Sequence, residues 1–292
     1  MNVYLMLPKL KIQNANALSS SYTIGFPAMT AWMGAVHAME RLVRREERFA
    51  DIRFPRAAVS CSQYSLQVYC GPGDYVNSVI ATANPLKKKG KKFERPPFIE
   101  EPRINLTVSL LISCTGVDGD NEKQLLQEIE TILPKMKMAG GDILSINKPQ
   151  IFYVSEEDGQ EEKKILRKLM PGFVIIERRD LMQNAGDSSS METLVSLLAV
   201  QHHARQEEMA GPQWSAEKEQ PGWLVPLAVG FHGISPIGKV AGQRDPMQEH
   251  CFAECAVTVG EWILPIRAQH IEEILWTYVY DEKHSMYVCV NQ

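Results

Sequence analysis

A β-strand is predicted at the start of the chain, where hydrophobic and polar positions alternate. Between Val3 and Ile12, hydrophobic residues recur at every second position, and Lys9 and Lys11 share a polar face near the end of the run. A period of two is typical of a strand with one buried face. The following residues, 13–27, are rich in Asn and Ser, and we expect them to form a polar loop.

A helix is predicted directly after this loop, because Pro27 suits the first turn of a helix. Its hydrophobic residues recur at spacings of four, three and four and so fall in one stripe: Trp32, Val36, Met39 and Val43. The opposite side carries one histidine and four arginines: His37, Arg41, Arg44, Arg45 and Arg48. We expect one buried face and one cationic face.

Three further strands and a second helix complete the first half of the chain. Strands are predicted at residues 57–70, 104–113 and 143–154, and a helix that contains Leu125 should kink or end at Pro134. The order strand, helix, strand, strand, helix, strand is that of the ferredoxin-like fold, which RNA-recognition domains also use. We therefore predict an α+β fold in which two helices cover one face of an antiparallel sheet and the other face stays free for a ligand.

The second half, residues 156–292, has a mixed α/β pattern. It predicts helices at 161–170 and 191–208, a polar connection at 209–221, strands at 173–176, 223–227 and 286–290, and a helical stripe from Ile271 to Tyr278. We expect two regions: a ferredoxin-like, RNA-recognition-like domain at residues 1–155, and an α/β elaboration at 156–292 that packs on it.

A basic insertion, residues 71–102, separates the second and third predicted strands and is too long for a hairpin turn. It carries six positive charges within nine residues: Lys87, Lys88, Lys89, Lys91, Lys92 and Arg95. Such a cluster gains most by meeting a polyanion, although a solvated loop is the alternative. Its position on this fold favours nucleic acid.

Charge is distributed unevenly along the chain, although the formal net charge of −4 alone would argue against a nucleic-acid partner. Residues 1–103 hold 15 Lys and Arg against 8 Asp and Glu, whereas the remainder holds 16 against 27. This asymmetry suggests one basic face on an acidic body. Chance clustering on solvated surfaces is an equally good account of composition alone.

The chain is expected to be cytoplasmic and to have no membrane contact. No hydrophobic run approaches the ~20 residues of a membrane-spanning helix, and the first eleven residues have neither a basic leader nor a small-residue cleavage site. Six cysteines are too sparse for a disulfide scaffold, so we expect reduced thiols.

The polar loop is the second candidate for RNA contact. Its uncharged side chains can read base edges or ribose, but they can equally satisfy their own backbone and cap the next helix. These side chains are Gln13, Asn14, Asn16, Ser19, Ser20 and Ser21.

No residue pattern identifies a catalytic or metal centre. His37 could act as a general base, but the sequence places no partner beside it. The cluster His250, Cys251 and Cys255 resembles half of a zinc site without a second ligand pair, and the adjacent pair at residues 202–203 is predicted on a helix, where its side chains diverge. We expect no cofactor and no metal.

Several collinear blocks resemble one subunit of the type I-F CRISPR surveillance (Csy) complex, a member of the RAMP superfamily. They include LPKLKIQNANALSS at 7–20, GFPAMTAWMGAVHAMERLV at 25–43, Asn84-Pro85-Leu86, MAGGDIL at 138–144 and PGWLVPLAVGFHGISP at 221–236. The blocks extend from one end of the chain to the other, and their order is specific.

The resemblance implies a RAMP-type ferredoxin-like domain whose inserted hairpin, the thumb, corresponds to residues 71–102 and meets the 5′ handle of the CRISPR RNA (crRNA). It implies pairing with the large subunit, which reads the protospacer-adjacent motif (PAM) of double-stranded target DNA, and contact with a neighbouring backbone subunit. The role implied is non-catalytic, because another subunit cuts the precursor RNA. The residues expected to bind RNA are Lys9, Lys11, Gln13, Asn14, Asn16, Ser19, Ser20, His37, Arg41, Arg45, Asn84, Lys87, Lys88, Lys89, Lys91, Lys92 and Arg95.

Two other functions remain open at this point. Some RAMP relatives cut RNA without a metal, so a repeat-processing endoribonuclease with His37 as general base is one alternative. A pure interaction scaffold, whose basic patch meets an acidic protein or target DNA, is the other.

Overall fold

The predicted order of six elements is present in the first half of the chain, in a computed structural model that describes residues 1–80, 86–95, 101–155, 159–183, 189–207 and 211–291. The elements are β1 (Asn2–Asn16), α1 (Met29–Val43), β2 (Arg53–Leu66), β7 (Arg103–Thr115), α2 (Glu122–Ile132) and the short β8 (Lys137–Met138), followed by β9 (Gly141–Ser145) and β10 (Gln150–Val154). The single strand predicted at 143–154 is therefore wrong, because β9 and β10 pair with two different parts of β1. Short 3-10 turns follow the two helices: η1 (Glu47–Phe49) and η2 (Leu133–Lys135), the latter containing Pro134 as expected.

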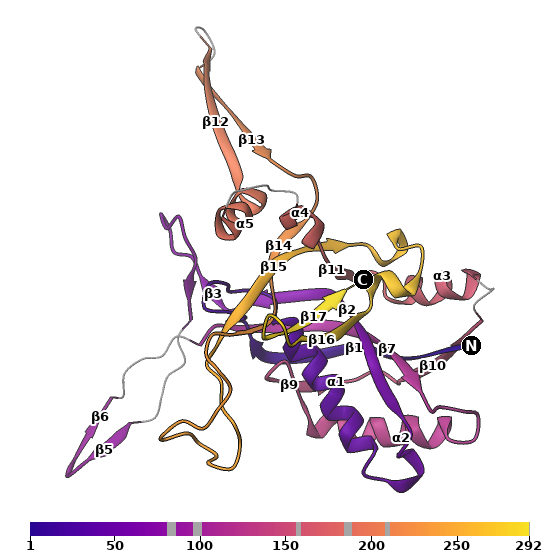
Figure 1. Ribbon diagram of the computed structural model, residues 1–292. Coiled ribbons are helices and arrows are strands. Elements are labelled where there is room, and N and C mark those ends of the chain that lie inside the picture. Colours follow the sequence, from indigo (N-terminus) through magenta and orange to yellow (C-terminus); the bar gives the residue numbers. More distant parts are fainter. Residues whose placement is uncertain (81–85, 96–100, 156–158, 184–188, 208–210, 292) are drawn as a thin grey trace.

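Strands β2, β7 and β1 lie side by side, and β9 and β10 both pair with the far edge of β1, every pairing being antiparallel. Helices α1 and α2 lie on one side of this sheet (Figure 1). The result is an α+β fold with a large antiparallel sheet, and its strand order is compatible with the RNA-recognition arrangement.

Strand β1 is longer than predicted, so Gln13, Asn14 and Asn16 lie on a strand and not in a loop. Its pairing with β7 shifts register twice, and Lys9 and Asn14 sit at these shifts with φ values of 51° and 57°. Bulges of this kind absorb an extra residue while the ladder continues. The polar pattern of residues 13–16 therefore marks an irregular strand end.

The second half extends the same sheet. Its elements are α3 (Gly159–Lys168), β11 (Phe173–Glu177), α4 (Arg179–Gln183), α5 (Ser190–Leu198), β12 (Val200–Glu207), β13 (Gly211–Lys218), β14 (Leu224–Gly233), β15 (Ala253–Ile263), η3 (Pro265–Arg267), η4 (Ile271–Ile274), β16 (Trp276–Asp281) and β17 (Met286–Asn291). Within the described residues the sheet has 11 strands, and hydrogen bonds close β2, β11, β15, β14, β17 and β16 into a ring.

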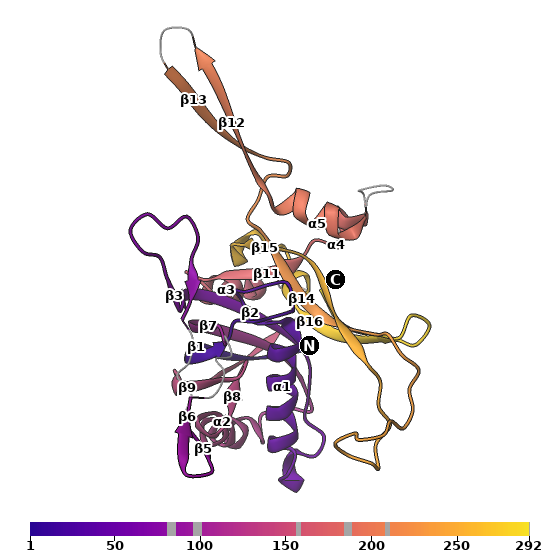
Figure 2. The same ribbon diagram turned by 90° about the vertical axis from the view of Figure 1, so that its left-hand side faces the viewer.

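The predicted helix at 191–208 is wrong beyond Leu198. Ser189 and Glu192 form a capping box that starts α5. From Val200 the chain instead forms β12, which pairs with β13 where a polar connection had been predicted. This hairpin projects away from the rest of the molecule (Figures 1 and 2). Because neither of its faces packs on the core, its sequence lacks the alternation of hydrophobic and polar residues that predicts a strand.

The predicted helical stripe from Ile271 to Tyr278 is also wrong. Ile271 and Ile274 are buried in a 3-10 turn, and the chain then becomes β16. Trp276 is fully buried and its indole donates a 2.9 Å hydrogen bond to the carbonyl of Ile175 on β11. The spacing of buried residues here reflects a turn followed by a strand, not one helix.

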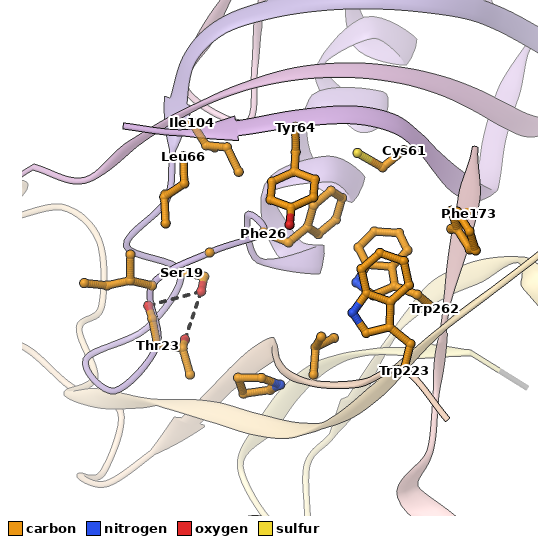
Figure 3. A pocket seen from close by; sticks show the side chains of 14 residues that line it. Ser19, Thr23, Phe26, Cys61, Tyr64, Leu66, Ile104, Phe173, Trp223 and Trp262 are labelled. Carbon is orange, nitrogen blue, oxygen red and sulfur yellow. Dashed lines mark hydrogen bonds between the residues drawn. The ribbon is translucent and has the colours of Figure 1, made fainter. Parts of the chain in front are cut away.

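The loop at 17–26, strand β2 and strands β11, β14 and β15 surround a pocket with aromatic walls (Figure 3). This pocket lies on the same side of β2 and β7 as helix α1, because Leu66 and Ile104 both line it and contribute to the cluster under that helix.

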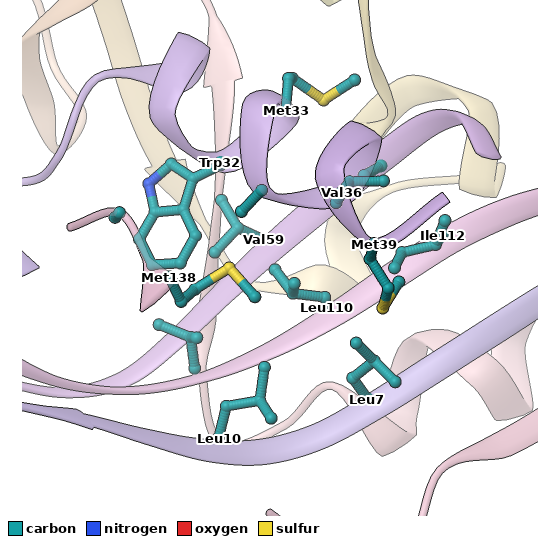
Figure 4. Packing of buried hydrophobic residues seen from close by; sticks show 14 of the residues in the cluster. Leu7, Leu10, Trp32, Met33, Val36, Met39, Val59, Leu110, Ile112 and Met138 are labelled. Atoms are coloured by element: carbon teal, nitrogen blue, oxygen red, sulfur yellow. The ribbon is translucent and has the colours of Figure 1, made fainter. Parts of the chain in front are cut away.

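The main core lies between the sheet and helices α1 and α2 (Figure 4). The predicted stripe of Trp32, Val36, Met39 and Val43 is confirmed, since all four are buried. Leu7 and Leu10 of β1 and Leu110 of β7 meet this stripe from the sheet. Burial of such side chains contributes roughly 1.5–3 kcal/mol each to folding.

The prediction that the second face of the sheet stays free is wrong for one half of it. Tyr4, Met6 and Leu111 on that face are buried against α3 and the turns η3 and η4. The other half, formed by the ends of β1 and β2 and the start of β7, is left open by the residues that the structure describes. Among the described residues, no helix has the length and hydrophobicity required to cross a bilayer.

Candidate nucleic-acid interface

The open half of the second sheet face carries a row of polar side chains, which we call the polar strip, beside the exposed apolar side chain of Leu144. Its residues come from three neighbouring strands: Lys11 and Gln13 on β1, Asn105 and Thr107 on β7, and Gln63 and Ser65 on β2. Lys11 lies opposite Thr107, and Thr107 lies opposite Gln63, so these side chains share a face. The strip has cationic, amide and hydroxyl groups, which are the groups that contact phosphates, ribose and base edges.

Hydrogen bonds hold the amide side chains at this end of the sheet in fixed positions. The backbone N–H of Asn14 donates to Asn105 Oδ1 at 3.0 Å, and Gln67 Nε2 donates to Asn14 Oδ1 at 2.6 Å. The hydroxyl of Thr107 donates to Gln63 Oε1 at 3.2 Å. Because both lone pairs of an amide oxygen can accept, these groups remain able to bind a ligand.

A polar hollow continues the strip around the end of the sheet. Asn14, Gln67 and Ile80 line it together with Arg103 and Lys137. Arg103 pairs with Glu101 at 2.6 Å, and Lys137 pairs with Asp142. The sequence reasoning missed both cations as well as Gln63, Ser65, Asn105 and Thr107. Their alternation along β2 and β7 was the signal that could have found them.

The basic insertion forms two small ladders, and the first begins before the predicted boundary. Strands β3 (Val68–Tyr69) and β4 (Ser78–Val79) pair next to the sheet, and β5 (Lys87–Lys89) and β6 (Lys92–Glu94) form a second hairpin. Gly90, with a φ of 63°, occupies the two-residue turn between β5 and β6. We call residues 86–95 the lysine hairpin.

Every residue of the lysine hairpin is exposed. Lys87 lies opposite Glu94, and Lys89 Nζ lies 3.2 Å from a carboxylate oxygen of the same glutamate. The five lysines therefore share one acidic neighbour in the pairing, which leaves a strong excess of positive charge on a two-stranded hairpin. Arg95 directly follows β6, whereas Asn84 lies outside the described residues.

The insertion leaves and re-enters the sheet at the end that carries the polar strip. It departs after Leu66 of β2 and returns at Arg103 of β7, where the Gln67 N–H donates to the carbonyl of Arg103 at 2.9 Å. The lysine hairpin and the polar strip thus belong to one end of the fold (Figures 1 and 2).

The serines of the predicted RNA-contacting loop are largely used within the loop. The hydroxyl of Ser20 is buried and lies 2.7 Å from Thr23 Oγ1, which also lies 2.9 Å from Ser19 Oγ. Asn16 exchanges hydrogen bonds with the backbone of Leu18 at 3.1 Å. The alternative that these side chains form hydrogen bonds within their own segment therefore accounts for Ser19, Ser20 and Asn16. Asn16 is nevertheless exposed next to the hollow.

The cations of the first helix lie on the opposite side of the sheet from the polar strip. His37 and Arg41 are exposed on α1, and the His37 ring lies 6.3 Å from that of Tyr278. The helix ends at Val43, so Arg45 follows it instead of lying on its surface. The structure therefore does not bring these residues together with Lys9, Lys11 and Gln13.

The histidine and cysteine candidates are dispersed. His202 and His203 lie on β12, not on a helix, and alternate across its two faces. Cys251 donates to the carbonyl of Ser235 at 3.0 Å. In the part of the chain that is described, no group of three or more His, Cys, Asp and Glu residues is arranged to hold a metal ion.

Comparison with known proteins matches nearly the whole chain to one family. Residues 5–289 match the family described as CRISPR-associated protein (Cas_Csy2). The chain is also 29% identical, over 311 aligned positions that cover 97% of it and 93% of the relative, to CRISPR-associated protein Csy2 of Pseudomonas aeruginosa (strain UCBPP-PA14). The family match covers almost the whole chain and confirms the resemblance drawn from the sequence blocks. The chain therefore belongs to the Csy2 family of CRISPR-associated proteins.

Proposed function

We propose that this chain is a non-catalytic subunit of a type I-F CRISPR surveillance complex and binds the 5′ handle of crRNA. In this proposal residues 1–155 form the RAMP-type RNA-binding domain, residues 71–102 its thumb and residues 156–292 the elaboration. The observation that carries it is the common position of the lysine hairpin and the polar strip at one end of the sheet.

The two surfaces supply different parts of RNA recognition. The lysines of the hairpin neutralise phosphates, which contributes affinity without sequence information. Lys11, Asn105 and Thr107 lie on a sheet face, the surface on which RNA-recognition folds splay single-stranded bases and contact ribose hydroxyls. A handle strand that crosses the strip while the hairpin holds its backbone uses both.

The family membership supports the remaining partners. We propose that the chain pairs with the large subunit, lies next to a backbone subunit and acts near the PAM of double-stranded target DNA in the cytoplasm. His37 lies across the sheet from the strip, so it cannot reach RNA that lies there. This separation favours a binding role over the endoribonuclease alternative.

The central test is RNA affinity as a function of salt. The full-length chain, alone and with its large subunit, is titrated with a repeat-derived crRNA 5′-end oligonucleotide. Replacing Lys87, Lys88, Lys89, Lys91 and Lys92 with Ala should weaken binding and reduce the slope of log affinity against log salt by up to about 3.5, at roughly 0.7 for each phosphate contact on a single strand.

A matched control removes five exposed lysines from other parts of the surface: Lys123, Lys148, Lys163, Lys164 and Lys283. This control lowers the net charge equally and should leave the slope close to that of the unmodified chain. Equal losses in both variants would contradict the assignment of the hairpin and would indicate a general charge effect.

The scaffold alternative predicts something different. A scaffold associates with the large subunit in the absence of crRNA, and the presence of crRNA does not strengthen that association. Co-expression of the two subunits with and without a CRISPR array, followed by size-exclusion chromatography and nucleic-acid absorbance, distinguishes the two.

A further inference from the structure

An aromatic pocket lies beside the loop at 17–26, on the side of the sheet that faces away from the polar strip. Strand β2 provides one wall, the β14–β15 pair the opposite wall, and the loop that carries Ser19 and Thr23 closes one side (Figure 3). All of its lining residues lie in described segments.

Packing between aromatic rings fixes the walls of this pocket. The ring of Trp262 meets Phe26 edge-to-face at 4.8 Å, and that of Trp223 meets Phe173 edge-to-face at 5.2 Å. Phe26 in turn stacks on the buried Trp32 of α1 at 5.3 Å. Edge-to-face and offset pairs are the favoured geometries of aromatic side chains, so the walls are rigid before any ligand arrives.

Polar groups point into this hydrophobic space. The hydroxyl of Tyr64 and the indole nitrogens of Trp223 and Trp262 are turned towards its open centre, and the Ser19 and Thr23 hydroxyls lie across from them (Figure 3). The pocket therefore offers two indole N–H donors and the Tyr64 hydroxyl among rings, whereas the Ser19 and Thr23 hydroxyls already lie 2.9 Å apart in a hydrogen bond within the loop. Rings with a few convergent polar groups suit a flat, heteroaromatic ligand.

The size of the pocket restricts the ligand further. Its volume is about 210 Å³, below the roughly 300–1,000 Å³ of pockets that hold drug-sized molecules. One planar heterocycle fits such a space, and a nucleotide chain does not.

The pocket and the polar strip meet at the edge of β2. Residues 63–66 continue past the point where β11 pairs with Cys61, and Tyr64 lines both the pocket and the groove over the strip. Tyr64 is 66% exposed at this edge and Trp223 is 45% exposed. A strand lying on the strip can therefore turn one base over the edge and into the pocket.

We infer that the aromatic pocket binds one flipped-out nucleobase of the RNA strand that lies on the polar strip. This inference rests on the proposed RNA-binding function. The base stacks on the indole of Trp223 and the phenol of Tyr64, and the indole N–H and hydroxyl groups hydrogen-bond its edge.

A scan of abasic positions tests this assignment. Repeat-derived crRNA 5′-end oligonucleotides, each lacking one base, are titrated against the full-length chain by fluorescence anisotropy. One position should lose about 5- to 160-fold in affinity, the range expected for one base–aromatic stack. The Trp223→Ala and Tyr64→Ala variants should bind the complete oligonucleotide more weakly than the unmodified chain does. Removal of that same base should then cause no further loss of affinity in either variant.

Trp214→Ala is the matched control, because Trp214 is exposed on the projecting β12–β13 hairpin, away from the pocket. It should reproduce the abasic profile of the unmodified chain. Tyr64→Ala guards against misfolding, because Tyr64 lies at an exposed edge, and thermal melting confirms that each variant is folded.

The outcomes separate the inference from the proposed function. If RNA binds but the abasic profiles of all variants match that of the unmodified chain, the pocket assignment is wrong and the proposed function stands. If the unmodified chain binds no RNA, both the pocket assignment and the proposed function are wrong. If Trp223→Ala keeps the RNA profile but loses the large subunit on size-exclusion chromatography, a protein side chain occupies the pocket and the inference is overturned.

Discussion

The hydroxyl of Tyr278 donates a 2.9 Å hydrogen bond to the backbone carbonyl of Met33, a residue 245 positions earlier in the chain. Tyr278 lies on β16 of the elaboration, and Met33 lies on α1 of the first half. The bond thus joins the helix that covers the sheet to the ring of strands that continues it. It adds to the strand pairings of β11 and β16 with β2, which already place the two halves in one sheet.

Replacement of Tyr278 by Phe should lower the free energy of unfolding by about 1 kcal/mol, because it removes this bond and leaves the ring in place. Urea denaturation measures the change. Tyr75→Phe, at a fully exposed tyrosine, should leave stability unaltered. Equal stability of both variants would show that water replaces the Tyr278 hydroxyl at no cost.

The buried thiols Cys114 and Cys289 should make the protein less stable at alkaline pH. Burial raises the pKa of each from 9.0 to about 12, because the thiolate is poorly solvated inside the fold. Because the pKa is raised in the folded state, each neutral buried thiol contributes its full stabilisation below pH 9. This contribution to the free energy of unfolding decreases as pH rises from 9 towards 12. Cys114→Ala and Cys289→Ala should therefore each flatten the pH dependence of unfolding between pH 8.5 and 10.5, whereas an unchanged dependence would mean that neither thiol ionises on unfolding.

Glu40 connects α1 to the start of β2. This mostly buried carboxylate accepts the backbone N–H of Phe54 at 2.7 Å and pairs with Arg44 at 3.4 Å. Glu40→Ala should reduce the free energy of unfolding by about 1–3 kcal/mol, because it leaves the Phe54 N–H unsatisfied. Glu40→Gln keeps an acceptor and should lose less, and Glu47→Ala, at an exposed site, should have little effect. If Glu40→Ala unfolds like Glu47→Ala, the bond does not anchor the strand.

His37 should have no part in RNA cleavage. It lies on the helix side of the sheet, away from the polar strip. The full-length chain, incubated with repeat RNA between pH 5 and 9, should leave the RNA intact on a denaturing gel, and His37→Ala should bind crRNA as tightly as the unmodified chain. Cleavage that disappears in His37→Ala would restore the endoribonuclease alternative.

The sequence by itself determined the elements that have a clear local hydrophobic pattern, either a stripe on one face or a continuous run. The stripe from Trp32 to Val43 predicted α1, and the hydrophobic run at 104–113 predicted the central strand β7. It also located the lysines of the hairpin, because a charge cluster is visible without a fold. Local patterns suffice in these cases, since α1 packs one whole face against the main core and β7 is buried on both faces.

Only the tertiary structure decided where the remaining residues act. Residues 276–281 became β16 because they pair with distant strands. Helix α3 and turn η4 cover one half of the second sheet face, and the polar strip lies on the other half. The pocket brings Tyr64 together with Trp223, which is 159 positions away in sequence. Contacts of this kind leave no local periodicity, because their partners are supplied by chain segments far apart in sequence.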